Sequence, residues 1–328
     1  MSERSGGVSM TICSSEEHAK ILSHCGRVGV LMGGNSAERD ISLESGANVM
    51  SAMQRAGIES VPFDWDGSLD NIQEWKSCDR FFIAAHGRGG EDGKLQSVLE
   101  IMDIPYTGTK VLGCALCMDK NLTKRAWRGA NLLTPDSMLV TGSTNAEQLV
   151  DRLGLPLMIK PAREGSSFGI TKADSINEVM PAIRLALTYD KIVLAEVYVA
   201  GSEYTIAVLN ETSLPVIKIE TPQPFFNYDA KYFGNDTRYF CPSELTETAE
   251  AELKKIALDA FSSINGFGWG RVDVMLDVER SPWLIEANAV PGLTSHSLVP
   301  MAANNVGISF DELVIMILGT SMTKGQFG

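Results

Sequence analysis

The sequence predicts a chain of several α/β and α+β domains that opens with a parallel sheet. Its 328 residues are too many for one compact core. Between Arg27 and Ala85, apolar strands alternate with helical patterns, which is the order found in parallel sheets. From Asp119 onward, strands and helices follow one another in mixed order, which predicts α+β domains.

The composition is that of an ordinary globular protein, with 44% hydrophobic and 21% charged residues. A formal net charge of −13 opposes binding to nucleic acid or acidic membranes, so an anionic ligand requires a local basic pocket. Because no signal peptide or long apolar stretch is evident, we expect a cytoplasmic protein with no membrane insertion. The lone Cys114-Ala-Leu-Cys117 motif, with no second pair nearby, is interpreted as packing rather than as a zinc site.

The first domain is predicted from three strands, Arg27–Met32, Glu59–Phe63 and Arg80–Ala85. Loops at the carboxyl ends of parallel strands form the binding face of such a sheet. The turn at Gly33–Ser36, before the helix Ala37–Ala56, lacks the G-x-G-x-x-G spacing of dinucleotide-binding folds. The sequence therefore argues against a nicotinamide cofactor.

Two residues on this face are candidate ligands. Glu38 lies in the first turn of a helix, where an acid also complements the helix dipole. His86 opens a glycine-rich loop, His86–Gly93, whose backbone can approach a ligand closely, although an ordinary loop histidine would explain it too. Residues 1–25 precede the domain as an extension with a possible short helix, Ser14–Ser23.

The rest of the chain is predicted to contain these strands and helices: strands Thr134–Val140, Pro156–Pro161, Ile192–Tyr198, Tyr204–Leu209 and Val216–Glu220, and helices Asp119–Gly129, Ala146–Gly154, Thr246–Asn265 and Ser309–Leu318. Lys160 enters the Gly/Ser-rich loop 162–170, an arrangement that grips phosphate, although a mobile hairpin tip has the same pattern. Glu196 and Glu203 lie within or beside apolar strands, where acids need partners such as ribose hydroxyls or an adenine amino group. The long segment 222–242, with Lys231-Tyr232 at its centre, predicts a lid.

A hairpin near the C-terminus carries the most specific chemistry. Arg271 and Asp273 share one face of its first strand, and Glu286 and Asn288 share one face of its second. A turn centred near Glu279 would set Asp273 opposite Glu286, where two like charges repel unless a cation lies between them. Oxygen ligands of this kind suit Mg²⁺, although two surface acids would give the same pattern.

Several ordered motifs resemble those of a known family: GGNSAERDISLESG at 33–46, HGRGGEDG at 86–93, KPAREGSSFG at 160–169, AKYF at 230–233, GRVDVM at 270–275 and EANAVPGLTSHS at 286–297. By these motifs the chain resembles the ATP-grasp superfamily and, within it, the bacterial D-alanine–D-alanine ligase family. The resemblance implies the ATP-grasp fold with an extension 1–25, an N-terminal substrate domain 26–108, a central domain 109–196, and a C-terminal domain 197–328 with the lid 222–242.

The resemblance also implies site residues. The metal ligands would be Asp273, Glu286 and Asn288, holding two Mg²⁺ ions, with Mn²⁺ possible. ATP would contact Lys120, Lys160, Glu196, Val197, Glu203 and Lys231. D-alanine would contact Glu38, His86, Arg271, Gly292 and Ser297. The catalytic set would be Glu38, Ser166, Tyr232, Arg271, Gly292 and Ser297, with Ser166 and Tyr232 bonding to Glu38 when the lid closes. Val197 stands where relatives can have lysine, but that contact is through the main chain.

The activity implied is ATP-dependent joining of two D-alanine molecules through an acyl phosphate, for peptidoglycan precursors, by a homodimer. One alternative is a ligase of the same fold with D-lactate or D-serine as acceptor, although Tyr232 favours an amine. A second is a catalytically silent ATP-binding protein. Arg271, placed at the transferring phosphoryl group, argues against that second alternative.

Overall fold

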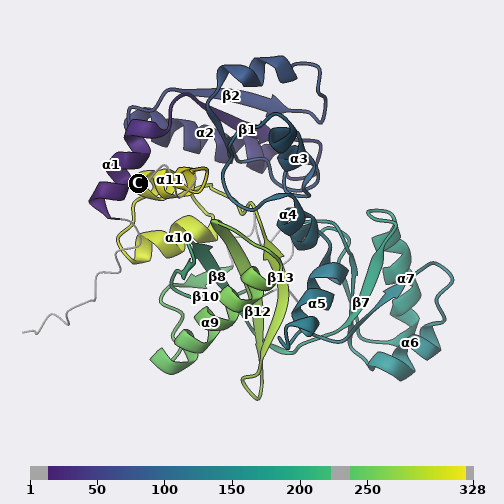
Figure 1. The fold of residues 1–328 in the computed structure, drawn as a ribbon. Coiled ribbons are helices and arrows are strands. Elements are labelled where there is room, and N and C mark those ends of the chain that lie inside the picture. The colour runs from purple at the N-terminus through teal and green to yellow at the C-terminus, as the bar shows by residue number, and fades with distance from the viewer. Residues whose placement is uncertain (1–13, 223–236, 323–328) are drawn as a thin grey trace, which may run out of the picture.

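The first strands form the parallel sheet that the sequence predicts (Figure 1). The computed structural model describes residues 14–222 and 237–322. Strands β1 (Val28–Gly33), β2 (Ser60–Trp65) and β3 (Arg80–Ile83) pair in the order β2-β1-β3, parallel throughout. Every residue of β1 is buried, as expected for the central strand of a covered parallel sheet.

Helices follow the strands and place the loops of the binding face. Helix α2 (Arg39–Arg55) begins directly after Glu38, which is its N-cap residue. The 3-10 helix η1 (Ile72–Ser77) connects β2 to β3, and α3 (Lys94–Ile101) begins after the glycine-rich loop. Glu38 and His86 therefore both lie at the carboxyl edge of the sheet, as predicted.

The second sheet is antiparallel and has its own apolar core. Its order is β4-β7-β5-β6, from the strands β4 (Ser137–Val140), β5 (Leu157–Pro161), β6 (Thr171–Ala173) and β7 (Val193–Val197). Helices α6 (Ala146–Leu153) and α7 (Ile176–Leu187) cover one face and bury Leu149, Val179 and Ile183 against it. The opposite face is left for polar side chains, among them Lys160.

The third sheet is also antiparallel, in the order β11-β10-β8-β12-β13, with β9 paired to β8. Its strands are β8 (Gly201–Leu209), β9 (Thr212–Ser213), β10 (Ile217–Glu220), β11 (Arg238–Phe240), β12 (Trp269–Asp277) and β13 (Pro282–Asn288). Helix α9 (Glu247–Ser263) packs on this sheet. Strand β11 falls within the predicted lid segment, so the end of that segment is a strand and not a loop.

Helix α5 (Lys120–Gly129) connects the sheets. Its buried residues are Lys120, Thr123, Lys124 and Trp127, a spacing that places them on one face. Trp127 is fully buried and donates from Nε1 to the Ala260 carbonyl of α9 at 3.0 Å. The helix therefore holds two lysine ammonium groups in a fixed position between the second and third sheets.

The C-terminal helices return to the first sheet. Helix α11 (Phe310–Gly319) packs against α2 and against α1 (Ser15–His24), which confirms the short N-terminal helix (Figure 1). Within the described ranges, no single helix has the length and apolar content needed to cross a bilayer. The pair formed by α10 (Leu298–Asn305) and α11, bent by 107°, passes that test together.

In the part of the chain that the structure describes, four helices were not predicted from the sequence: α3, α4 (Val111–Met118), α7 and α10. Helix α4 is apolar on most sides, so it shows no clear amphipathic period. Helix α7 contains Pro181 but begins with a capping box between Ser175 and Glu178, a local signal that could have revealed it. The predicted domain boundaries stay predictions.

Candidate active site

Strands β12 and β13 form the predicted hairpin in the predicted register. Asp273 pairs with Glu286, and Arg271 pairs with Asn288. Glu279 lies in the turn between the strands. Directly opposed residues project to the same face of a sheet, so two carboxylates, a guanidinium and an amide lie together.

The Asp273 carboxylate is buried and held by several donors. Arg271 donates from Nε to Oδ1 at 2.9 Å and from Nη2 to Oδ2 at 2.8 Å. Thr205 donates from Oγ1 to Oδ1 at 2.6 Å, and Asn288 donates from Nδ2 to Oδ2 at 3.3 Å. The paired bonds from Arg271 are charge-assisted and fix the orientation of the carboxylate.

Glu286 is balanced by a different cation. Its Oε2 lies 3.2 Å from Nζ of Lys120, which also donates to the Glu164 carbonyl at 2.7 Å. The repulsion expected between the facing acids is thus offset by Arg271 on one carboxylate and Lys120 on the other.

The donor set on this hairpin fits magnesium. Among the described residues, no three or more His, Cys, Asp or Glu side chains gather as a metal site. Two carboxylates and one amide oxygen form a smaller set, and Mg²⁺ usually takes one or two carboxylates and completes its shell with water and phosphate oxygens.

A cavity of about 490 Å³ opens between the second and third sheets. Its polar lining includes Lys120, Lys160, Glu203 and Glu286. Its apolar lining includes Met158, Ile170, Ile219, Met275 and Ile285. Apolar walls with a few convergent charged groups are typical of a nucleotide-sized ligand site.

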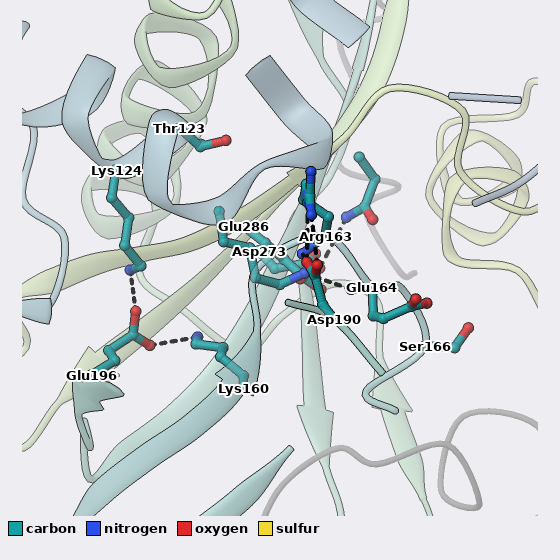
Figure 2. A network of polar contacts seen from close by, with 12 residues as sticks. Thr123, Lys124, Lys160, Arg163, Glu164, Ser166, Asp190, Glu196, Asp273 and Glu286 are labelled. Atoms are coloured by element: carbon teal, nitrogen blue, oxygen red, sulfur yellow. Dashed lines mark hydrogen bonds and ion pairs between the residues drawn. The ribbon is translucent and has the colours of Figure 1, made fainter. Parts of the chain in front are cut away.

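Glu196 is shared between two lysines (Figure 2). Lys160 donates from Nζ to its Oε1 at 2.6 Å, and Lys124 forms an ion pair with its Oε2. Burial raises the pKa of the Glu196 carboxyl, but Lys124 and Lys160 outweigh it and hold the pKa below its ordinary value. In this structure Glu196 therefore acts as a counter-ion for the two lysines.

Val197 lies outside the lining of the larger cavity. Its amide N–H donates to the Asp136 carbonyl at 2.9 Å, and its side chain lies on a separate groove with Trp283. The cavity is instead lined by the next residues, Tyr198 and Val199. A main-chain contact to the nucleotide at this hinge remains a prediction.

A second cavity of about 90 Å³ adjoins the first. The predicted substrate residues line it, together with two of the predicted metal ligands: Glu38, His86, Ser166, Arg271, Glu286, Asn288, Gly292 and Ser297. Ser166 donates from Oγ to Glu38 Oε1 at 2.5 Å, so the predicted bond between the loop and the first domain is present. The fold thus brings together two residues that are 128 positions apart in the chain.

The loop that carries Ser166 has an unusual backbone. Ser166 and Ser167 have φ values of 51° and 61°, in the left-handed region that non-glycine residues rarely adopt. A Cβ on Gly165 would come within 2.5 Å of Glu38 Oε2, so only glycine allows this approach. Strained loop residues of this kind concentrate at ligand sites.

His86 is buried and fixed by two contacts. Its Nδ1 lies 2.8 Å from the Val290 carbonyl oxygen, and its Nε2 lies 2.8 Å from Ser45 Oγ. Burial lowers the pKa of His86, although nearby Glu38 opposes that effect. The ring is therefore neutral at pH 7, with the Nδ1 proton donated to the carbonyl.

Glu91 lies in the same cavity and was not singled out from the sequence. It accepts from the backbone N–H groups of Gly87 at 2.9 Å and Val290 at 3.1 Å. Burial, and then the charge of Glu38, raise the pKa of Glu91 to about 8. It ties the glycine-rich loop to the segment after β13.

Arg88 links the first domain to the Gly/Ser-rich loop 162–170, which carries Ser166 and is called the serine loop below. It donates from Nε to the Arg163 carbonyl at 2.9 Å and from Nη2 to the Tyr189 carbonyl at 3.1 Å. Nη2 also lies 2.6 Å from Glu164 Oε1. This arginine bridges the His86–Gly93 loop to the residues immediately before Ser166.

Two predicted residues, Lys231 and Tyr232, lie outside the described residues. Lys124, Glu91 and Arg88 were missed because their roles depend on contacts with residues that are distant in the chain. Their motifs offered a partial signal: Arg88 and Glu91 belong to HGRGGEDG, and Lys124 lies one helical turn after Lys120.

The sequence of this chain matches those of known proteins. A family model described as "D-ala D-ala ligase C-terminus" matches residues 131–319, and one described as "D-ala D-ala ligase N-terminus" matches residues 66–109. The chain is 50% identical over 303 residues to a D-alanine–D-alanine ligase from Nitrosococcus oceani, covering 92% of this chain and 96% of the relative. It is 51% identical over 305 residues to one from Alkalilimnicola ehrlichii, covering 93% and 96%.

Solved structures agree. The D-alanine–D-alanine ligase from Bacillus anthracis complexed with ATP is similar with a TM-score of 0.81 and 31% identity, covering 90% of this chain and 97% of that one. The VanG D-Ala:D-Ser ligase from Enterococcus faecalis has a TM-score of 0.79 and 28% identity, covering 90% and 99%.

The fold and the paired cavities define an ATP-dependent ligase of the ATP-grasp class. Within that class, the chain belongs to the D-alanine–D-alanine ligase family.

Replacing Arg88 with alanine is expected to loosen the serine loop without unfolding the protein. The substitution removes the contacts to Arg163, Tyr189 and Glu164, so amide hydrogen exchange across residues 163–169 should speed up about tenfold or more. Arg27→Ala, which removes an exposed ion pair with Glu59 in the same domain, should leave that exchange unchanged. Equal exchange in the Arg88 variant and the wild type would show that the bridge does not order the loop.

Proposed function

We propose that the enzyme joins two molecules of D-alanine into D-alanyl-D-alanine, with conversion of ATP to ADP and phosphate, for peptidoglycan precursors. Membership of the D-alanine–D-alanine ligase family supports this reaction. The position of Glu286 supports placing the reaction at this site, because Glu286 lines both the nucleotide-sized cavity and the smaller substrate cavity. A phosphoryl group can pass between two bound molecules only where their cavities meet.

The reaction order follows from the chemistry of the substrate. A carboxylate is a poor acyl donor because it has no good leaving group, so the γ-phosphoryl group of ATP is transferred to the first D-alanine carboxylate, which gives an acyl phosphate and ADP. The amine of the second D-alanine attacks the acyl carbon, phosphate leaves, and the amine loses a proton. Negative charge develops on the phosphoryl group and then on a tetrahedral oxyanion, so cations and N–H donors supply most of the catalysis.

The first D-alanine would lie against Glu38 and His86. The Glu38 carboxylate pairs with the substrate ammonium group, and Ser166 orients that carboxylate through their 2.5 Å hydrogen bond. His86, neutral and locked between Val290 and Ser45, adds no competing charge. These residues therefore bind and orient the amino acid whose carboxylate is phosphorylated.

The reacting carboxyl group would be held by Arg271 and the Gly292 amide. Arg271 is fixed on Asp273 and lines the substrate cavity. A Cβ on Gly292 would come within 2.8 Å of Ser297 Oγ, so glycine allows the close approach at this point. Ser297 contacts the second D-alanine in the proposal.

ATP would occupy the larger cavity. Lys120, Lys160 and Lys231 neutralise its phosphates, and Glu196, Val197 and Glu203 contact the adenosine. Asp273, Glu286 and Asn288 would hold two magnesium ions, or manganese in their place. When bound, these ions would supply positive charge that neutralises the phosphate oxygens. Tyr232 and Ser166 would close the site above Glu38, and exclusion of water would protect the acyl phosphate.

An acceptor other than D-alanine is the second candidate. The D-Ala:D-Ser ligase named above shares the fold at 28% identity, close to the 31% of the Bacillus anthracis D-alanine–D-alanine ligase. The relatives that share about 50% identity with this chain are D-alanine–D-alanine ligases, so this candidate is not favoured. A homodimer and a cytoplasmic location complete the proposal, as the family resemblance implies.

The proposed reaction predicts phosphate release that requires both D-alanine and magnesium. Purified enzyme with ATP should release phosphate when both are present and show only background release when either is withheld. Mass spectrometry of the product should show D-alanyl-D-alanine even when D-lactate and D-serine compete. An enzyme that is inert with D-alanine yet active with another amino or hydroxy acid would contradict the proposal.

Glu286→Ala tests the metal assignment. Loss of one ligand removes stabilisation of the phosphate charge worth several kcal/mol, so kcat should fall about 100-fold or more while the protein stays folded. Glu279→Ala, in the exposed turn of the same hairpin, should keep normal turnover. The assignment is wrong if the Glu286 variant turns over near the wild-type rate at ordinary magnesium concentration.

A further inference from the structure

Lys124 lies behind the nucleotide cavity, and nothing in the proposed mechanism uses it. Its side chain is fully buried, and its position four residues after Lys120 places both lysines on the same face of α5. Lys120 lines the cavity, whereas the lining residues do not include Lys124. A buried lysine requires a partner, because burying an unpaired charge is costly.

Two groups hold the Lys124 ammonium in place. Its Nζ donates to Thr134 Oγ1 at 2.7 Å, and Thr134 in turn donates to the Leu284 carbonyl of β13 at 2.8 Å. The ammonium also forms an ion pair with Glu196 Oε2. Lys124 is therefore anchored to the third sheet through Thr134. Figure 2 shows its ammonium group facing Glu196, an acid of the second sheet.

Glu196 serves both lysines, one on each carboxylate oxygen. Its Oε1 accepts from Lys160 at 2.6 Å, and the side chains of Lys160 and Glu196 are 4% and 3% exposed. Two ammonium groups and one carboxylate leave this buried triad with one excess positive charge. An anionic group entering the adjoining cavity would balance that charge. Lys160 and Glu196 both line the cavity, so Lys160 is the lysine of the triad that can reach such a group.

We propose that Lys124 is a positioning residue for ATP binding: it remains as the permanent counter-ion of Glu196, so that Lys160 is free to turn to the nucleotide phosphates. This inference rests on the proposed role of Lys160 at the phosphates. Without Lys124, Lys160 would be the only buried cation on Glu196, and its movement to a phosphate would leave a buried carboxylate unpaired. Burial lowers the pKa of Lys124 to about 8, opposed by Glu196, so the ammonium form still predominates at pH 7.

The decisive readout separates phosphate binding from adenosine binding. Lys124→Met keeps the length of the side chain and removes its charge. The affinity for ADP and for a non-hydrolysable ATP analogue, measured by calorimetry, should fall about tenfold or more, while the inhibition constant of adenosine should change less than about twofold. Lys124→Arg should recover most of the nucleotide affinity, and Arg125→Met, an exposed neighbour on α5, should match the wild type.

A double variant tests the link through Glu196. In a Glu196→Gln background the carboxylate no longer competes for Lys160, so adding Lys124→Met should weaken ADP binding much less than it does in the wild type. If Lys124→Met does not fold, Thr134→Val, which removes the anchor of the ammonium, carries the same comparison of ADP with adenosine.

Three results would overturn the inference. Lys124→Met could weaken the binding of adenosine and ADP equally, or weaken neither, or its effect could be strictly additive with that of Glu196→Gln in the double variant. These outcomes are distinct from failure of the proposed function. An unmodified enzyme that releases no phosphate with D-alanine would contradict the function, whereas an active wild type with an unaffected Lys124→Met variant would contradict only this role of Lys124.

Discussion

The site depends on two carboxylates that face each other across the β12–β13 hairpin. Asp273 and Glu286 are set opposite one another by strand register, and like charges in that position repel. Arg271 and Lys120 offset the repulsion from two sides, one from the same strand and one from α5. Each carboxylate is therefore already oriented and charge-balanced, and the residues that balance it are themselves proposed to meet the substrate or the nucleotide.

Opposite charges are paired in the same way at two places outside the hairpin. Glu196 balances two lysines, and Arg88 bridges the glycine-rich loop to Glu164. In each case an acid is held by a basic side chain from another strand, helix or loop, so the position of these elements and the charge balance of the site support each other. Buried ion pairs are weak evidence for stability. Their placement beside the cavities instead suits a site that exchanges protein partners for ligand groups.

Sequence patterns predicted the features that depend on residues close together in the chain. The alternation of Arg271 to Leu276, and the turn near Glu279, were enough to place Asp273 opposite Glu286, and the strand and helix order was enough for the parallel sheet. The bond from Ser166 to Glu38 was expected only through family resemblance, since no spacing rule relates positions 128 residues apart. Lys124 had only a partial signal, its position one helical turn after Lys120, because its role depends on where Thr134 and Glu196 come to lie.

The most direct test of the account is a crystal structure with magnesium, an ATP analogue and a phosphinate mimic of the reaction intermediate. We expect metal density bounded by Asp273, Glu286 and Asn288, and the phosphates of the analogue in the cavity lined by Lys120. We also expect Lys160 Nζ to have moved from Glu196 to a phosphate oxygen while Lys124 stays on Glu196. Metal or phosphates bound away from the hairpin would contradict it.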